Sequence, residues 1–253
     1  MTLRPFFPYF GAKWRAAGHV PAPLHSVLIE PFAGSACYAL RHHQRQVRLY
    51  DLDPVISGIW DYLIRTPSSE ILSLPDLPLD AEVDSLRVCQ EARWLIGFWL
   101  NKGVAYPCQR WSRWGHKPAY RTGCNFWGQG VRERIVRQQP SIRHWTVCNL
   151  SYDQIPRLPA TWYIDPPYQD KGSAYRMSAD QIDFAHLGGW CQSLLGQVMV
   201  CEQSGADWLP FEEFGEIKST KGKSSEVMWL NGAGKAQQNL FSLKTIDSCT
   251  DGE

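Results

Sequence analysis

Short apolar runs alternate along the chain with patterns of helical period. Residues 27–30 and 47–50 have the pattern of buried strands, and the first is followed by helical spacing through Cys37, Leu40 and Arg41. The second leads into Asp53 and Pro54, which suit a helix N-cap and first turn. Apolar residues then recur at helical spacing at Ile56, Ile59, Trp60, Leu63 and Ile64. This order predicts an α/β protein with a doubly wound parallel sheet, whose ligands bind beyond the carboxyl ends of the strands.

The same strand pattern returns in the second half of the chain. Residues 146–148, 161–164 and 197–201 are predicted strands, residues 180–195 a helix, and residues 217–230 a hairpin around Gly222. Between the two halves, residues 66–79 are rich in Pro and Ser, residues 86–100 predict a helix, and residues 101–127 are irregular. We therefore expect a catalytic domain of residues 1–65 and 146–253, interrupted by an inserted, mainly helical and irregular region of residues 66–145.

Composition limits the size, the redox state and the cellular location that we expect for the protein. A chain of 253 residues with 44% apolar residues is long enough for an α/β domain and a subdomain. Its eight cysteines form no C-x-x-C pair, which predicts reduced thiols and no metal centre. No signal-peptide pattern and no apolar run of roughly 20 residues occurs. We expect a cytoplasmic protein without a membrane partner, and favour a monomer.

Positive charge is concentrated in the middle of the chain. The formal net charge is +1, yet residues 86–150 hold 11 Lys or Arg against two Asp or Glu, and half of the 12 tryptophans. A basic, aromatic surface suits a phosphate backbone. The predicted DNA contacts are Arg110, Arg113, Lys117 and Arg121. The alternative is a solvated loop with its tryptophans folded inward, and Trp94 and Trp99 fit a core better.

Asp165-Pro166-Pro167-Tyr168 directly follows the apolar run of residues 161–164. An exocyclic amino group on a base is a poor nucleophile until two acceptors draw its nitrogen toward tetrahedral geometry. The Asp165 carboxylate and the Pro166 carbonyl could be those acceptors, because successive prolines hold the backbone extended. Tyr168 offers a ring on which a base can stack. The alternative is a strand that simply stops at prolines.

A nucleoside-type ligand is predicted by two further features. Residues 30–35 form the first strand-to-helix turn, where backbone N–H groups favour an anionic group. The turn holds a single glycine, Gly34, so the dinucleotide pattern G-x-G-x-x-G is absent. Asp51, about 20 residues further on, is placed to bind ribose hydroxyls. Alone, such an aspartate is more often a cap.

Together these motifs resemble the Dam-like DNA adenine methylases, which are N6-adenine methyltransferases. The resemblance rests on residues 9–13 (Tyr-Phe-Gly-Ala-Lys), residues 30–34 (Glu-Pro-Phe-Ala-Gly), Asp51 and residues 165–168 (Asp-Pro-Pro-Tyr), in the order of the family's alpha group. It covers about residues 5–230, although much of the middle diverges. The resemblance also favours a phage or prophage origin for this chain. Ala12 departs from the glycine common at its position in the family.

The resemblance implies a Rossmann-like methyltransferase fold and S-adenosyl-L-methionine as cofactor. It places Tyr9 and Lys13 on the cofactor, Glu30, Phe32 and Gly34 at its methionine end, and Asp51 on its ribose. Tyr152 is similar to a position that contacts the cofactor's adenine ring. Asp165 would lie between the cofactor and the target. The catalytic residues implied are Asp165, Pro166 and Tyr168.

The expected reaction is methyl transfer to the amino group of an adenine flipped out of double-stranded DNA. Residues 169–177, which include Gly172, could close over that base. The recognition sequence stays open, from GATC-specific to relaxed. Cytosine N4, a glutamine side chain, RNA adenine and a non-catalytic DNA-binding protein remain alternatives. Asp165 at the first position of the tetrad formed by residues 165–168 favours adenine.

Overall fold

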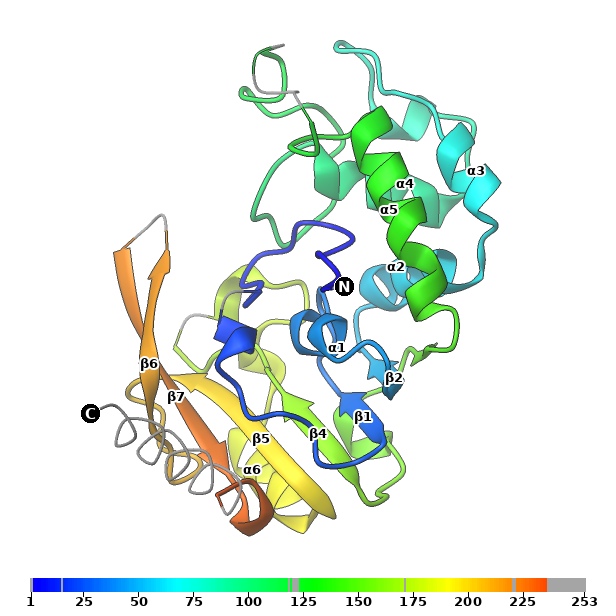
Figure 1. Cartoon of the computed structure of the whole chain (residues 1–253). Coiled ribbons are helices and arrows are strands. Elements are labelled where there is room, and N and C mark those ends of the chain that lie inside the picture. Colours follow the sequence, from blue (N-terminus) through cyan, green and yellow to red (C-terminus); the bar gives the residue numbers. More distant parts are fainter. Residues whose placement is uncertain are drawn as a thin grey trace, which may run out of the picture.

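In the computed structural model, seven strands of the described residues form one mixed sheet (Figure 1). The structure describes residues 2–14, 16–117, 119, 123–170, 172–219 and 222–235. Strand order is β3-β2-β1-β4-β5-β7-β6; β1 to β5 are parallel, and β7 is antiparallel to both β5 and β6. The strands are β1 Val27–Glu30, β2 Gln46–Tyr50, β3 Thr146–Cys148, β4 Ala160–Ile164, β5 Gly196–Gln203, β6 Glu212–Ser219 and β7 Gly222–Leu230.

Side chains alternate between the two faces of the sheet, and each face has its own hydrophobic core. Leu28, Tyr163 and Met199 belong to one core, while their neighbours Ile29 and Trp162 belong to the other. Because successive side chains of a strand point to opposite faces, strands buried on both faces become apolar throughout. This explains the uniform apolar runs seen in the sequence.

Helices cover both faces. Those that contribute to the first core are α1 Cys37–Arg41, α2 Pro54–Arg65, α3 Ser68–Ser73, α4 Gln90–Trp99 and α5 Gln129–Gln138, whereas α6 Phe184–Ser193 packs into the second. In Figure 1, α2 to α5 gather on one side of the molecule, away from the β6–β7 hairpin. The predicted α/β fold, a Rossmann-like sheet with helices on both faces, is confirmed.

Four details of the sequence interpretation were wrong. The helix predicted at residues 86–100 begins only at Gln90 and is preceded by a separate 3-10 turn at residues 83–85. Residues 66–79, which are rich in Pro and Ser, contain helix α3, which was not predicted. Helix α5 was not anticipated, since its sequence carries three arginines and its buried apolar side chains are only Val131 and Ile135. The predicted helix at residues 180–195 is shorter, with α6 preceded by a separate turn at residues 179–181.

The region of residues 66–145 shares its core with the sheet domain. The Trp99 indole donates to the Phe6 carbonyl at 3.0 Å, and the Phe7 and Phe98 rings lie 5.3 Å apart. Gln138 and the Arg4 backbone exchange two hydrogen bonds. Whether this region serves as an inserted target-recognition domain stays a prediction.

Most tryptophans of the basic region are structural. Trp99, Trp111, Trp127 and Trp145 are buried, and the last three donate their indole N–H to backbone carbonyls of Leu77, Pro75 and His43 at 2.9–3.1 Å. Trp114 is the exception, with 53% of its surface exposed. For these four residues the alternative interpretation, with tryptophans folded inward, is therefore the correct one.

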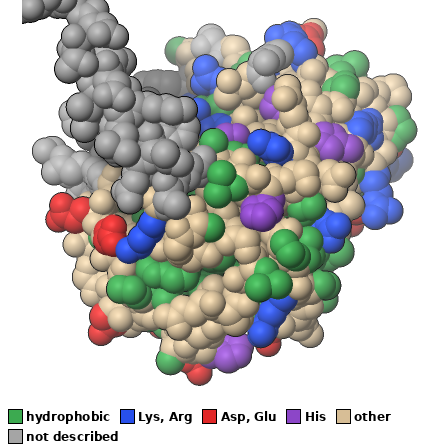
Figure 2. Space-filling model, turned by 60° about the horizontal axis from the view of Figure 1, so that its bottom comes forward, with side chains coloured by type: hydrophobic (Ala, Val, Ile, Leu, Met, Phe, Trp, Pro, Cys, Tyr) green, Lys and Arg blue, Asp and Glu red, His purple; other side chains and the backbone are tan. Residues whose placement is uncertain are grey.

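Figure 2 shows the bottom of the molecule as it is drawn in Figure 1. On this face, hydrophobic and basic side chains lie in small separate groups.

Candidate functional site

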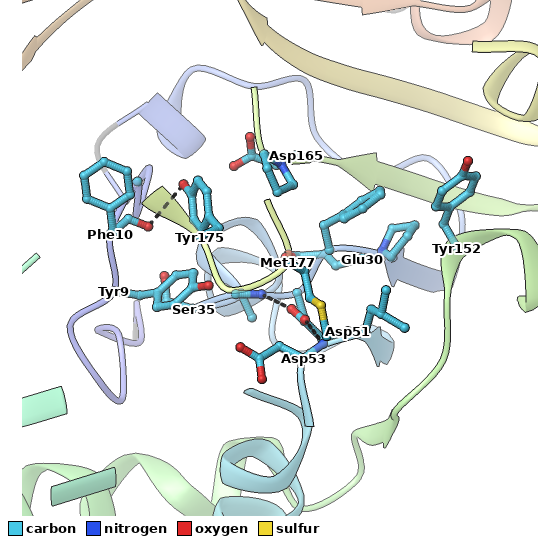
Figure 3. A pocket seen from close by; sticks show the side chains of 18 of the residues that line it. Tyr9, Phe10, Glu30, Ser35, Asp51, Asp53, Tyr152, Asp165, Tyr175 and Met177 are labelled. Carbon is cyan, nitrogen blue, oxygen red and sulfur yellow. Dashed lines mark hydrogen bonds between the residues drawn. The ribbon is translucent and has the colours of Figure 1, made fainter. Parts of the chain in front are cut away.

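The sheet has a switch point between β1 and β4. From β1 the chain proceeds to β2 and β3 on one side, and from β4 to β5 on the other. Connections that leave in opposite directions open a crevice at the carboxyl ends of the two central strands. A cavity lies there, with an empty volume of about 1030 Å³ including its open mouth (Figure 3). It is lined by residues 9–13, 30–37, 51–53 and 150–152, by Tyr163, Asp165, Pro167, Tyr175, Met177, Ser178, Gln181 and Ile182.

The turn after β1 is held in an unusual backbone conformation. Gly34 has φ +45° and Ala36 has φ +50°, both in the left-handed region. The Gly34 carbonyl accepts from the Trp60 indole of α2 at 2.8 Å, which fixes the turn against the core. A Cβ on Gly34 would lie 3.2 Å from the Tyr9 ring, so this position requires the absence of a side chain.

Asp51 follows β2 and is oriented by the backbone. Its Oδ2 accepts from Gly34 N at 3.0 Å and its Oδ1 from Asp53 N at 2.9 Å (Figure 3). Burial raises the pKa of Asp51 to about 7, and these two hydrogen bonds oppose that rise. Each oxygen keeps a second lone pair with which to accept a hydroxyl from a ligand.

Glu30, at the carboxyl end of β1, lies at the base of the same cavity. It is 2% exposed, and its Oε1 accepts from Ala39 N of α1 at 2.6 Å. Burial raises the pKa of Glu30 well above the ordinary value of a glutamate. This carboxyl group therefore ties β1 to α1 and is neutral more readily than an exposed one.

Aromatic rings flank the far side of the cavity. Phe32 and Tyr152 lie 5.7 Å apart with their planes 32° from parallel, and the Tyr152 hydroxyl hydrogen-bonds to His186 Nδ1 at 2.7 Å. A capping box between Ser151 and Gln154 shapes the short turn that carries Tyr152. Two apolar ring faces beside Asp51 suit a flat heteroaromatic group attached to a sugar.

The tetrad after β4 divides between two environments. Asp165 and Pro167 line the cavity, and Pro166 is buried. Tyr168 is directed elsewhere: its hydroxyl donates a short hydrogen bond to Glu226 on β7. The structure thus brings Asp165 together with Tyr9, Lys13, Glu30, Phe32, Gly34, Asp51 and Tyr152, but does not place Tyr168 on the cavity wall.

Lys13 lies between the tetrad and β7. Its ammonium forms a short ion pair with Asp165 Oδ1, is 3.8 Å from Glu226 Oε2, and lies 4.2 Å from the centre of the Tyr168 ring. Burial alone would lower the pKa of Lys13, but the Asp165 carboxylate above all, with smaller contributions from Cys201 and Glu226, raises it overall. The ammonium therefore stays charged. Glu226 was not singled out in the sequence, because nothing local marks it as facing the tetrad.

The segment after the tetrad covers one side of the cavity. Tyr175 packs on Phe10, with ring centres 5.4 Å apart, and its hydroxyl donates to the Phe10 carbonyl at 3.4 Å (Figure 3). Arg176 Nε is 3.7 Å from Asp53 Oδ2. Glu202, at the end of β5, accepts from Gln169 N at 3.3 Å and from the Trp208 indole at 3.1 Å. This segment is therefore tied to the N-terminal segment, α2 and β5.

The predicted DNA-contacting residues lie on an exposed loop. Arg110 donates to Glu82 Oε1 at 2.6 and 2.8 Å, Arg113 is exposed, and the Lys117 ammonium lies 5.2 Å from the Trp114 ring centre. Arg121 falls outside the described residues. Glu82 partly neutralises Arg110, which the charge count alone did not reveal.

The described residues contain no group of three or more His, Cys, Asp or Glu side chains arranged to hold a metal ion. No helix among them is long and apolar enough to cross a membrane.

No protein-family model and no curated protein sequence matches the chain. Among solved structures, it is similar to "Putative methyltransferase yhhF from Escherichia coli", with a TM-score of 0.33 and 10% sequence identity over 85% of this chain and 79% of that one. A likeness of this degree is too small to support a function.

Proposed function

We propose that the protein is an S-adenosyl-L-methionine-dependent methyltransferase that methylates N6 of an adenine in DNA. The observation that carries this proposal is the position of Asp165. A carboxylate at the carboxyl end of β4 shares one cavity with Asp51 at the end of β2 and the Gly34 turn at the end of β1. An amino-group acceptor and a nucleoside-binding carboxylate thus face the same space.

The residues of the cavity fit the cofactor's chemistry. Asp51 has a free lone pair on each oxygen for ribose hydroxyls. Phe32, which the resemblance placed at the methionine end, lies beside Tyr152 instead, and the two offer ring faces for an adenine. Glu30 and the backbone of the Gly34 turn are suited to the amino acid end, where both a positive and a negative group must be bound. When bound, the cofactor supplies an electrophilic methyl group on a sulfonium.

The protein's own contribution is positioning and charge. The Asp165 carboxylate and the Pro166 carbonyl would accept the two hydrogens of the amino group, which directs its nitrogen lone pair away from the ring. Asp165 also stabilises the positive charge that develops on this nitrogen. Tyr168 would stack on the flipped base, which requires its ring to turn from the position it has beside Lys13. Residues 169–177 would close over the base and exclude water.

DNA is the proposed partner because of the exposed loop that carries Arg110, Arg113, Lys117 and Trp114. Charges on such a loop contact phosphates, and Trp114 offers an exposed ring. The proposal leaves the recognition sequence open. Mapping the methylated sites on treated DNA distinguishes a strict from a relaxed sequence specificity.

The test is Asp165→Asn, which keeps the size of the side chain but removes its charge. We expect methyl transfer to unmethylated duplex DNA to fall about 10²–10³-fold, the range found when one charge-stabilising group is removed. Asp180→Asn, an exposed aspartate outside the cavity, is the matched control. Thermal unfolding confirms that both variants are folded.

The products are identified by mass spectrometry of digested DNA. N6-methyladenine supports the proposal, whereas N4-methylcytosine or methylation of RNA alone would reassign the substrate. DNA binding without any methyl transfer would identify a non-catalytic binding protein, and an Asp165→Asn variant with wild-type turnover would refute the role of Asp165.

A further inference from the structure

The Asp165 carboxylate is held by a lysine and not by the backbone around it. Its Oδ1 forms a short ion pair with the Lys13 ammonium, and no other group among the described residues donates a hydrogen bond to either oxygen. An aspartate commonly accepts from backbone N–H groups that follow it, but Pro166 and Pro167 have none. Asp51, in contrast, is oriented by two backbone N–H groups. The orientation of Asp165 therefore depends on Lys13.

Lys13 is itself held in place. Its carbonyl accepts from Ala17 N at 2.8 Å, which anchors the backbone in a turn of the N-terminal segment. Its ammonium lies 3.8 Å from Glu226 Oε2 on β7, a strand that is paired with both β5 and β6. The side chains of Lys13 and Glu226 are each 10% exposed. The ammonium is thus confined to its place beside Asp165.

The ion pair also affects the charge of Asp165. Burial raises the pKa of Asp165, and the Lys13 ammonium opposes that rise through its charge and its hydrogen bond. A protonated Asp165 would lack the negative charge that stabilises a nitrogen becoming positive. Glu226 adds a second carboxylate beside the ammonium, so the positive charge of Lys13 does not cancel the negative charge of the site.

Other titratable groups face this pair from neighbouring elements. Burial raises the pKa of every phenol and thiol among them, so these groups are neutral near pH 7: Cys37, Tyr163, Tyr168, Tyr175 and Cys201. The carboxyl groups are Glu30 on β1 and Glu226 on β7, and burial raises the pKa of both. None of these groups can supply the positive charge that Lys13 places beside Asp165.

We propose that Lys13 is a positioning residue, which holds Asp165 through Oδ1 and leaves Oδ2 to accept a hydrogen bond from the amino group of the substrate. The inference rests on the proposed function, and it gives Lys13 a different role from the cofactor contact that the resemblance implies. No bond to Lys13 forms or breaks during methyl transfer, and Lys13 stays an ammonium throughout. A carboxylate that must present one oxygen in one direction benefits from a fixed partner on the other, because small errors of orientation cost large factors in rate.

Lys13→Met tests the proposal, because it keeps an unbranched side chain of similar length without the charge. The rate constant of a single turnover on duplex DNA is measured from about pH 5 to about pH 9. Removal of an opposite charge raises the pKa of a carboxyl group, so the acidic limb of the profile should move to higher pH by about 1–3 units. Near pH 7 the rate should fall at least about tenfold, and part of it should return as the pH rises.

Three controls accompany this variant. Lys13→Arg keeps the positive charge, so its acidic limb should stay within about half a pH unit of wild type. Lys235→Met removes the lysine of an exposed ion pair with Glu212 and should leave the profile unchanged. The dissociation constant of S-adenosyl-L-methionine, measured by calorimetry, should change less than about threefold in Lys13→Met. If thermal unfolding shows that Lys13→Met is not folded, Lys13→Gln, which is uncharged but can still donate to Asp165, takes its place with the same expected shift.

The outcomes separate this inference from the function beneath it. An acidic limb that stays at the wild-type pH in Lys13→Met, or one that moves as far in Lys13→Arg, would overturn the positioning role. Cofactor binding weakened more than about tenfold with an unchanged limb would also overturn it, because Lys13 would then be a cofactor contact. In each of these cases the proposed function stands if the wild type produces N6-methyladenine. A wild-type protein that transfers no methyl group overturns the proposed function and this inference with it.

Discussion

Asp51 should make the stability of the protein depend on pH in an unusual direction. Its pKa is raised in the folded state from 3.8 to about 7, chiefly by burial. A carboxyl group whose pKa is higher in the folded state binds its proton more tightly there. Its contribution to the free energy of unfolding is therefore full below pH 3.8 and is lost as the pH rises through about 7.

The size of the effect follows from the two pKa values. Integration of the proton linkage between pH 5 and pH 7 gives a loss of about 2 kcal/mol from this one group. Asp51 keeps part of its surface in contact with solvent, so this is an upper value. Asp51→Asn removes the titration; its amide can accept from Gly34 N but not also from Asp53 N, which costs about 1 kcal/mol at every pH.

Urea unfolding at pH 5 and pH 7 measures the difference. We expect wild type, compared with Asp51→Asn, to lose up to about 2 kcal/mol between the two pH values. Asp61→Asn, which replaces an exposed aspartate of α2, should follow wild type. Wild type and Asp51→Asn losing stability in parallel would show that Asp51 is not the titrating group.

Three further substitutions test how the cavity and the core are built. Gly34→Ala should lower the free energy of unfolding by about 1–2 kcal/mol and weaken S-adenosyl-L-methionine binding, because a Cβ is disfavoured at φ +45° and meets the Tyr9 ring. The control is Gly189→Ala in α6, where the added Cβ has open space and should stabilise by up to about 1 kcal/mol. Equal losses in both variants would contradict the steric reason. Tyr175→Ala should speed cofactor release about tenfold in stopped-flow measurements, which corresponds to a barrier to release that is lower by about 1.4 kcal/mol. Tyr175→Phe keeps the ring and should release the cofactor at nearly the wild-type rate. Unchanged release in the alanine variant would exclude a covering role for Tyr175. Trp127→Phe should lower the free energy of unfolding in urea by about 1–3 kcal/mol, because the Pro75 carbonyl loses its donor. Trp114→Phe on the exposed loop should change it by less than about 0.5 kcal/mol. Similar effects at the two positions would refute the distinction between core and surface.

Local patterns determined the elements of the sheet domain. The runs at residues 27–30 and 161–164 became strands because nearly all of their residues are buried, and Asp53 with Pro54 began α2 as their capping chemistry predicts. The predicted strand at residues 146–148 also formed, but at the edge of the sheet and largely exposed. Once these parallel strands had been identified, the carboxyl ends of β1, β2 and β4 had to lie at one edge. For that reason Glu30, Asp51 and Asp165 could be expected near one another from the sequence.

Other parts of the structure depend on contacts between distant segments. Helix α5 has little apolar sequence of its own and is held by Val131 and Ile135 in a core shared with the N-terminal segment. The tryptophans of the basic region were read partly as surface, yet four of them find carbonyl acceptors in segments 34 to 102 residues away. Side-chain type alone cannot decide between exposure and such a partner.

The sequence by itself determined the α/β fold, the edge of the sheet where the cavity lies, and the acidic residues that face that edge, because strand period and helix caps are local properties. Only the tertiary structure decided that Lys13 forms an ion pair with Asp165, that the Tyr168 hydroxyl donates to Glu226, and that Tyr175 covers the cavity. These contacts join the N-terminal segment, the loop after β4 and strand β7, and the physical reason is electrostatic: a buried charge takes whichever opposite charge the fold brings within reach, whatever its distance along the chain.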